Sequence, residues 1–254
     1  MLLLLPPSEG KAVPRRGRPL DLDALAHPEL TATRAAVLDA LIGLCREDPA
    51  GAVDVLGLGA RGAEEVARNA ALRAQPTAPA SRIYTGVLYD HLDVEGLPAG
   101  AKRRASRRVL VFSALWGVLR LADRIPSYRL SAGARLPGLA TPAAVWAPVL
   151  REALPADELC VDLRSGSYRS LWRPEAAPLV GVDVVREQAG RRTVVSHMAK
   201  ATRGAVARAL LVDDGRPPRT AEAVASRIEA AGWTVELGDA DRAGRATLTV
   251  VERG

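Results

Sequence analysis

Three short apolar segments place the strongest limit on the fold of this chain. They cover residues 1–5, 108–112 and 159–163, and each predicts a strand buried in a sheet. The first segment ends at Pro6 and Pro7, because proline has no amide hydrogen to donate to a neighbouring strand. Weaker patterns predict further strands at 179–186, 192–196, 234–237 and 246–252.

Segments with apolar residues at helical spacing alternate with these strands. They predict helices at residues 28–45, 62–72, 141–150, 199–211 and 220–231, while 83–89 fits either a strand or a helix start. The sequence has no clean βαβ series, no repeat of 20 to 50 residues and no low-complexity linker. We therefore predict a mixed α/β (α+β) fold, with one domain over residues 1–254 and a mixed sheet flanked by helices. Two lobes remain an alternative.

The charge balance favours an anionic partner. The 254 residues carry a formal charge of +6 and a pI near 9.9. Lysine occurs at only three positions, Lys11, Lys102 and Lys200, among 35 basic residues, and such arginine-rich usage often reflects genome composition. With that discount, nucleic acid, a nucleotide or phosphate is still the expected partner class.

No segment predicts export or membrane insertion. The apolar N-terminal run is too short for a signal peptide, and no apolar run reaches 18 residues. Cys45 and Cys160 lack CxxC or Cys/His spacing, and the three histidines are scattered. We expect a cytoplasmic protein that has neither a metal nor a cofactor and does not contact membranes.

A glycine-rich turn between two predicted helices is the first candidate contact with DNA. Residues 56–63 resemble the hairpin of a helix-hairpin-helix unit, in which backbone amides approach a phosphate. We place this element at about 34–72, and its predicted DNA contacts are Gly57, Gly59, Arg61 and Arg68. The alternative is an ordinary turn between helices in which the glycines supply positive φ angles.

Aromatic and arginine side chains alternate after the strand at 108–112. Trp116 and Tyr128 are predicted to stack on bases, and the nearby arginines to bind phosphate: Arg120, Arg124 and Arg129. This combination suits unpaired or bubble DNA. The alternative is that Trp116 belongs to the core and that Asp123 pairs with an arginine.

Polar residues follow three of the predicted strands, where α/β sheets commonly bind ligands. Lys11 follows the first strand, Asp162 and Ser165 follow the strand at 159–163, and His197 precedes a helix. These four are the candidate catalytic residues, with Asp162 or His197 moving a proton. Lys200 and Arg203 share a helical face and could bind an anion with His197. Structural roles are the alternative for each residue.

Six motifs, taken together, resemble the YaaA peroxide stress protein family. They lie at residues 5–11, 84–89, 113–120, 125–130, 162–168 and 196–204, and they read LPPSEGK, YTGVLY, SALWGVLR, IPSYRL, DLRSGSY and SHMAKATRG. The resemblance implies a cytoplasmic mixed α/β protein with a helix-hairpin-helix element and a positive cleft that binds DNA. It also implies a role in limiting intracellular iron and oxidative DNA damage during peroxide stress. The first and third motifs differ from the better-known members, which indicates a divergent branch.

Two functions follow as hypotheses, with a scaffold or partner-binding role as the remainder. The first is a DNA-binding stress protein whose cleft would use Lys11, Arg120, Arg129, Lys200 and Arg203. The second is an enzyme acting on a nucleobase, nucleoside or nucleotide in a pocket at the strand ends. Its pocket would join Ser8, Lys11, Tyr84, Thr85, Asp162, Ser165, Tyr168 and His197.

Overall fold

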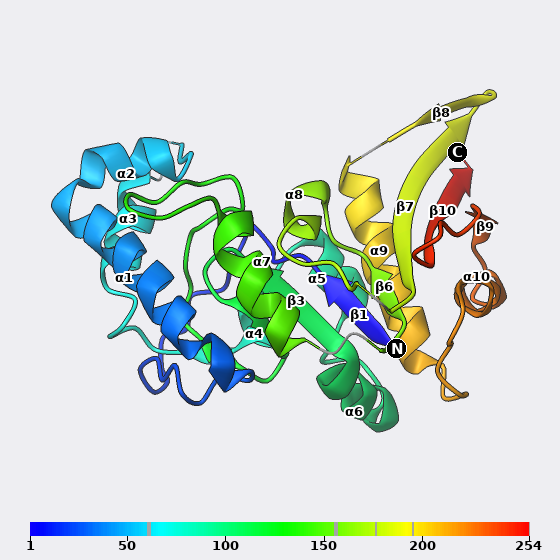
Figure 1. Cartoon of the computed structure of the whole chain (residues 1–254), viewed down its shortest axis with the longest axis horizontal. Helices are drawn as coiled ribbons and strands as arrows, with labels where there is room; N and C mark the ends of the chain where they lie inside the picture. The colour runs from blue at the N-terminus through cyan, green and yellow to red at the C-terminus, as the bar shows by residue number, and fades with distance from the viewer. Residues whose placement is uncertain (60–61, 155–156, 176, 195, 254) are drawn as a thin grey trace.

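A mixed sheet of eight strands forms the centre of the molecule (Figure 1). The computed structural model describes residues 1–59, 62–154, 157–175, 177–194 and 196–253. Five parallel strands lie side by side in the order β3 (Val109–Ser113), β1 (Leu2–Leu5), β6 (Cys160–Asp162), β7 (Leu179–Gln188) and β10 (Arg245–Arg253). Antiparallel strands flank them: β4 (Gly117–Leu119), β9 (Thr234–Leu237) and β8 (Arg191–Thr193), which pairs with β7. A separate pair joins β2 (Ala78–Pro79) to β5 (Arg124–Ile125).

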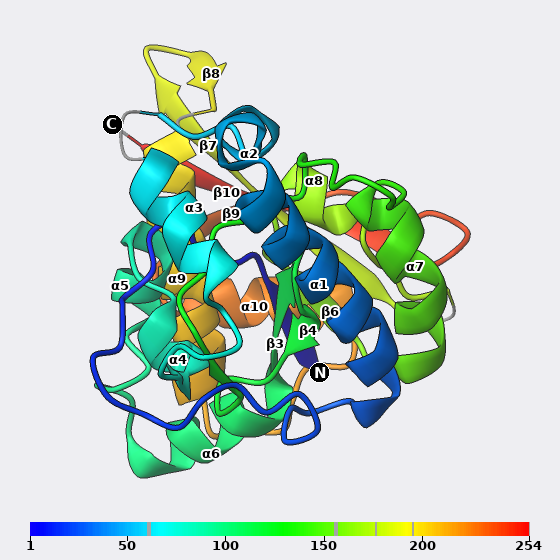
Figure 2. The same ribbon diagram turned by 90° about the vertical axis from the view of Figure 1, so that its left-hand side faces the viewer.

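Helices surround this sheet, so the predicted mixed α/β fold is confirmed. The helices are η1 (Pro28–Leu30), α1 (Thr31–Glu47), α2 (Pro49–Val55), α3 (Gly62–Ala70), α4 (Ala80–Ile83), α5 (Val87–Leu92), α6 (Ala99–Arg108), α7 (Pro142–Ala153), α8 (Gly166–Arg169), α9 (Ser196–Val212) and α10 (Ala221–Ala230). Helices α1 to α3 gather beyond the β4 edge, with α7 on one side of the sheet and α5 and α9 on the other (Figures 1 and 2). None of the described helices is both long and apolar enough to cross a bilayer.

Most predicted elements are confirmed, and the differences have local causes. The segment 83–89 is helical at both ends, and Gly86 with a φ of 97° separates α4 from α5. The predicted strand at 192–196 is wrong in its last part, because α9 already begins at Ser196. The basic run at 102–104 lies within helix α6, which leads directly into β3.

A buried arginine joins α1 to the open edge of the sheet. Arg34 is fully buried, and its guanidinium donates to the carbonyl oxygens of Trp116 (3.1 Å) and Val118 (2.8 Å) next to and within β4. A third bond, of 3.2 Å, reaches the carbonyl of His27. Burial lowers the Arg34 pKa to about 10. Arg34 therefore satisfies edge carbonyls that have no partner strand.

Helices α5 and α9 pack closely because α9 has a glycine at the contact. A Cβ atom at Gly204 would overlap the carbonyl oxygen of Leu88 and lie 3.0 Å from Cβ of His91. A side chain at this position would push the two helix backbones apart. The glycine therefore allows the short distance between α5 and α9.

We expect Gly204→Ala to lower the free energy of unfolding by about 1–3 kcal/mol, as other overpacked sites do. Gly43→Ala is the matched control, because Gly43 is also helical and a Cβ there meets nothing within 4 Å. That change should raise the free energy of unfolding by about 0.5–1 kcal/mol, because alanine favours the helix. Urea denaturation measures both, and equal effects at the two positions would contradict the close approach.

Candidate functional site

The carboxyl ends of β1, β3 and β6 meet at one edge of the sheet. β1 lies between β3 on one side and β6 on the other, and all three run in parallel. The chain continues from them into residues 6–11, 114–116 and 163–169. The chain passes from β1 to β3 on one side of β1 and then from β4 to β6 on its other side. This edge therefore contains the topological switch point at which open α/β sheets bind ligands.

Lys11 lies at this edge against two tyrosine rings. Its backbone forms a β-bridge with Tyr84. The Nζ atom donates to the carbonyl oxygen of Ser8 at 2.7 Å and lies 4.4 Å from the ring centroid of Tyr128 and 5.7 Å from that of Tyr84. An ammonium at this distance from a ring face gains cation–π attraction but loses water.

A chain of buried hydroxyl groups fixes the two rings. The Tyr84 and Tyr128 hydroxyls lie 2.9 Å apart, and the Tyr128 hydroxyl lies 2.7 Å from Oγ of Ser113 at the end of β3. Ser113 Oγ also accepts the backbone amides of Leu115 and Trp116, at 3.1 and 3.2 Å. Burial raises the pKa of both tyrosines, so they remain protonated and act as a rigid platform for Lys11.

The surroundings of Lys11 favour its uncharged form. Burial, and then the positive charge of Arg129, lower the Lys11 pKa to about 7, against the weaker opposite effects of Glu65 and Glu9. Arg129 is held nearby, because Asn69 of α3 pairs with its backbone amide and carbonyl at 2.9 and 2.8 Å. At neutral pH a large fraction of Lys11 is therefore a free amine.

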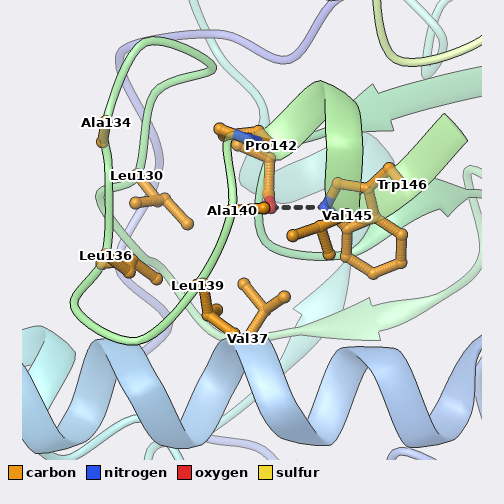
Figure 3. A pocket seen from close by; sticks show the side chains of 10 residues that line it. Val37, Leu130, Ala134, Leu136, Leu139, Ala140, Pro142, Val145 and Trp146 are labelled. Atoms are coloured by element: carbon orange, nitrogen blue, oxygen red, sulfur yellow. Dashed lines mark hydrogen bonds between the residues drawn. The ribbon is translucent and has the colours of Figure 1, made fainter.

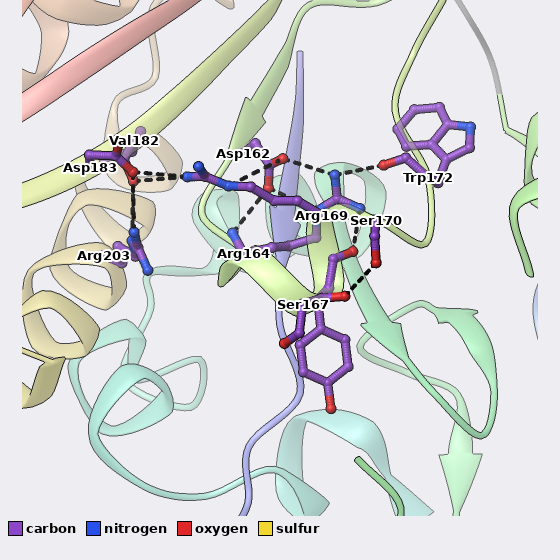
Figure 4. A network of polar contacts seen from close by, with 10 residues as sticks. Asp162, Arg164, Ser167, Arg169, Ser170, Trp172, Val182, Asp183 and Arg203 are labelled. Carbon is purple, nitrogen blue, oxygen red and sulfur yellow. Dashed lines mark hydrogen bonds and ion pairs between the residues drawn. The ribbon is translucent and has the colours of Figure 1, made fainter. Parts of the chain in front are cut away.

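The second cluster at this edge is centred on a buried ion pair (Figure 4). Asp162 and Arg164 are 1% and 0% exposed. Arg164 Nε and Nη2 donate to the two Asp162 carboxylate oxygens, each at 2.8 Å, and Nη2 also reaches the carbonyl of Trp172 at 2.8 Å. This pairing accounts for Asp162, so a proton-transfer role for its carboxylate does not fit.

Two further arginines adjoin the ion pair and share one carboxylate. Arg169 Nη2 lies 3.2 Å, and Arg203 Nη2 3.5 Å, from the same oxygen of Asp183 (Figure 4). Among the described residues, Arg169 Nε has no hydrogen-bond partner, and it lies 3.8 Å from Oδ2 of Asp162. Burial, and then Arg169, lower the Arg203 pKa, against the opposite effects of Asp183 and Asp162. The two guanidinium groups thus share Asp183, and Arg169 also lies within ion-pair distance of Asp162.

The structure brings some predicted site residues together and separates others. Ser8, Lys11, Tyr84 and Thr85 adjoin one another, and Ser8 Oγ accepts the amide of Thr85 at 3.1 Å. Tyr168 of α8 lies near Arg129, and burial raises its pKa to about 12. The remaining catalytic candidates are exposed, at the N-cap of α8 and in the first turn of α9: Ser165 and His197.

The aromatic residues predicted to stack on bases are buried. Trp116 is 0% and Tyr128 2% exposed, and their rings contact each other edge to face. Buried rings cannot stack on a base, so the predicted stacking does not fit this structure, whereas the alternative that Trp116 belongs to the core does. Asp123 accepts the Arg120 amide at 2.8 Å, which is a turn contact. The Arg124 guanidinium donates to the Thr77 carbonyl at 2.7 Å.

The glycine-rich turn joins α2 to α3, as expected for a hairpin between helices. Gly57 has a φ of 60°, and the Gly62 amide bonds to the Gly59 carbonyl at 2.8 Å. Arg61 lies outside the described residues. Arg68 pairs with Glu65 at 2.6 Å, and Glu64 and Glu65 occupy the first turn of α3. These carboxylates compete with a phosphate for the positive end of the helix, and the DNA-binding role of this turn remains a prediction.

Sequence reasoning missed three residues that shape the site: Ser113, Arg164 and Arg169. Asp162 and Arg164 are two residues apart, and this Asp-x-Arg spacing after a buried strand was the available signal. Ser113 directly follows apolar residues and carries no signal of its own. Arg169 directly follows the motif at 162–168, and nothing in the neighbouring sequence distinguishes it from the many surface arginines.

Two hollows in the surface contain none of the predicted site residues. A small apolar pocket of about 10 Å³ lies between α1, the 130–140 segment and α7, with Val37, Leu136 and Trp146 among its lining residues (Figure 3). A more open groove of about 690 Å³ lies between α4 and α6. The first holds one water at most.

The stability contributed by Lys11 should depend on pH. Its pKa is about 7 in the folded protein and ordinarily 10.5, so between these values the unfolded chain binds more protons at this residue, and stability rises with pH. We expect the free energy of unfolding of the unmodified protein to rise relative to that of Lys11→Met between pH 7 and 9. Urea denaturation across this range tests it. For Lys102→Met, at an exposed lysine, the difference in free energy of unfolding from the unmodified protein should not change with pH. If the difference for Lys11→Met does not change with pH either, the lowered pKa of Lys11 is excluded.

Asp162 should matter for stability through Arg164. Asp162→Ala leaves a buried guanidinium without its carboxylate, and we expect the free energy of unfolding to fall by about 3–5 kcal/mol. Adding Arg164→Met removes the unpaired charge and should restore part of the loss. Urea denaturation of both variants measures this. A loss below about 1 kcal/mol in the single variant would show that the ion pair does not stabilise this loop.

Comparison with known proteins places the chain in a family. Residues 1–235 match the family described as peroxide stress protein YaaA. A UPF0246 protein of Streptomyces coelicolor is 48% identical over 251 residues, covering 96% of this chain and 95% of the relative. A UPF0246 protein of Corynebacterium efficiens is 42% identical over 256 residues, covering 99% of this chain and all of the relative. With the match extending over nearly the whole chain, this protein belongs to the YaaA peroxide stress protein family.

Proposed function

We propose that this protein binds DNA in the peroxide stress response through a cationic arc at the carboxyl edge of the sheet. The arc consists of Lys11, Arg129, Arg169, Arg203 and Lys200. Membership of a family named for peroxide stress supports the stress role. The observation that carries the DNA-binding role is the gathering of these cations: Arg169 and Arg203 lie 3.2 and 3.5 Å from one oxygen of Asp183, and Arg129 lies close enough to Lys11 to act on its charge. Burial first, and then the neighbouring arginine, lower the pKa of Lys11 and of Arg203.

Cations gathered in this way create a positive potential that attracts an anion. The two halves of the arc meet at α8, because Tyr168 lies beside Arg129 and the next residue is Arg169. Lys200 is exposed and lies one turn before Arg203 on α9. A row of phosphates would relieve the repulsion within both halves at once, whereas a single small anion would relieve only one.

The same arc suggests how the protein would limit iron-dependent oxidative damage to DNA. Iron(II) ions concentrate near DNA because the phosphates attract cations. Arginine and lysine groups that occupy these phosphates displace the metal, so peroxide would react with iron away from the bound DNA. The bond between Asn69, near the C-terminal end of α3, and Arg129 ties this helix to the arc.

Fluorescence anisotropy with labelled duplex, bubble and single-stranded DNA tests the proposal. Four or five phosphate contacts predict an affinity about 150- to 500-fold lower at 200 mM than at 50 mM salt. Arg129→Ala/Lys200→Ala should weaken binding at low salt about tenfold or more and reduce the salt slope by about two. Since Trp116 and Tyr128 are buried, the predicted preference for unpaired or bubble DNA is withdrawn, and duplex and bubble should bind alike.

The matched control is Lys102→Ala/Arg103→Ala, which removes the same charge from exposed positions on α6, the helix that enters the amino end of β3. Binding to this variant should equal that of the unmodified protein at both salt concentrations. Binding that does not change with salt, or an equal loss in both double variants, would rule out the arc as the DNA site.

An enzyme acting on a nucleobase, nucleoside or nucleotide is the second candidate function. The specific observation in its favour is that Ser8, Lys11, Tyr84 and Thr85 adjoin one another at the topological switch point. Asp162 is committed to Arg164, and Ser165 and His197 are exposed. In this candidate the reactive group is therefore Lys11.

A further inference from the structure

Lys11 has a property that phosphate binding does not need. The chain uses lysine at three positions among 35 basic residues, and an arginine would hold a phosphate equally well or better. Only the amine can lose its proton near neutral pH and attack an electrophile. A lysine placed where its charge is disfavoured therefore calls for a chemical explanation.

The contacts of the Lys11 amine keep it available as a nucleophile. Its Nζ lies over the Tyr128 ring at 4.4 Å and donates to the Ser8 carbonyl at 2.7 Å. Among the described residues, no carboxylate lies within ion-pair distance of Nζ, and Glu9 and Glu65 act on it only from farther away. Lys11 as a whole is partly exposed, whereas the rings beneath its amine are buried.

An anion-binding group stands beside this amine. Within the described part of the chain, the Arg129 guanidinium makes one hydrogen bond, through Nη1 to the Glu9 carbonyl at 3.2 Å, and Arg129 is partly exposed. Its other N–H groups can hold a phosphate in a forked geometry. A substrate here would thus combine a phosphate with an electrophilic carbon a few bonds away.

We propose that Lys11 captures a phosphate-bearing sugar aldehyde as an imine, and that in DNA this aldehyde is the open-chain deoxyribose of a site that has lost its base. That the aldehyde belongs to DNA rests on the proposed function. The imine chemistry at Lys11 does not depend on that function. The uncharged Nζ attacks the aldehyde carbon, and a C–N bond forms. The carbonyl oxygen leaves as water with the two protons of the amine, and a C=N bond remains. Addition of water reverses the sequence and releases Lys11.

Reductive trapping tests the imine directly. Sodium cyanoborohydride reduces an imine to a secondary amine and so links protein and substrate permanently. The probes are a duplex with one abasic site, the same duplex with a tetrahydrofuran that has no aldehyde, and free deoxyribose 5-phosphate. We expect a stable adduct with the abasic duplex and with the sugar phosphate and none with the tetrahydrofuran duplex. Peptide mapping should place it on Lys11, which has only two other lysines to compete with it.

Lys11→Arg is the critical variant, because it keeps the positive charge and removes the nucleophile. It should lower the trapping rate at least tenfold. Lys102→Ala is the matched control and should trap like the unmodified protein. Circular dichroism and urea denaturation establish that Lys11→Arg is folded; Lys11→Met replaces it if that variant is not.

The pH profile gives a second readout. Trapping should rise with pH to a plateau with a midpoint near the Lys11 pKa of about 7, set by burial and by the facing charges of Arg129, Glu65 and Glu9. Arg129→Ala should move this midpoint upward, because it removes the neighbouring cation. If the midpoint is the same in Arg129→Ala, Arg129 does not act on the Lys11 amine and the proposed site is contradicted.

Failure of this inference differs from failure of the proposed function. Salt-dependent DNA binding without any adduct would end the imine proposal and leave DNA binding intact. An adduct with deoxyribose 5-phosphate but not with abasic DNA would support the chemistry and exclude DNA as its carrier. Adducts on Lys102, on Lys200 or on the N-terminal amine, with equal yield in Lys11→Arg, would overturn the proposal.

Discussion

The buried ion pair of Asp162 and Arg164 is the interaction on which this edge of the molecule depends. Asp162 ends β6, and Arg164 uses its remaining donors for the carbonyls of Tyr168 and Trp172, at 3.3 and 2.8 Å. The guanidinium carbon also lies 4.2 Å from the ring centroid of Phe112 in β3. One side chain thus fixes the loop after β6 against β3. Buried ion pairs add little net stability over apolar packing, so its value here is the position it gives to α8.

The position of α8 also determines where the neighbouring cations lie. Tyr168 faces Arg129 and the Lys11 side, while Arg169 faces Asp183 and Arg203. Arg169 and Arg203 also donate to the carbonyl of Val182, at 3.4 and 3.1 Å, but they remain partly exposed, unlike Arg34 and Arg164. The fold therefore uses the same residue type in two ways: buried arginines bond to backbone carbonyls and a carboxylate, and partly exposed ones gather at the carboxyl ends of the strands.

The sequence predicted the elements better than the contacts between them. The apolar runs at 1–5, 108–112 and 159–163 form three neighbouring parallel strands, because a strand that is apolar on both faces is stable only when both faces are covered. The same reasoning identified Lys11 and Tyr84, since polar residues at strand ends are visible in the sequence. It misjudged Trp116 and Tyr128, because an aromatic residue among arginines has the same pattern whether it faces solvent or the core. Arg34 could not be found at all, since its partners are edge carbonyls some 80 residues away along the chain.

Phosphate binding favours a charged Lys11, whereas attack on an aldehyde needs an uncharged one. The two are compatible because burial, and not the charge of Arg129, is the larger cause of the lowered Lys11 pKa. A bound phosphate neutralises Arg129 and so removes the second cause of the lowered pKa, which by itself would return the proton to the amine. The largest cause, however, is burial on the tyrosine platform, and it does not depend on Arg129. A phosphate held by Arg129 adds to this burial by excluding water from the amine. The platform, fixed by the hydroxyl chain from Tyr84 to Ser113, would therefore allow the proposed site to attract an anion and still present an uncharged amine to it.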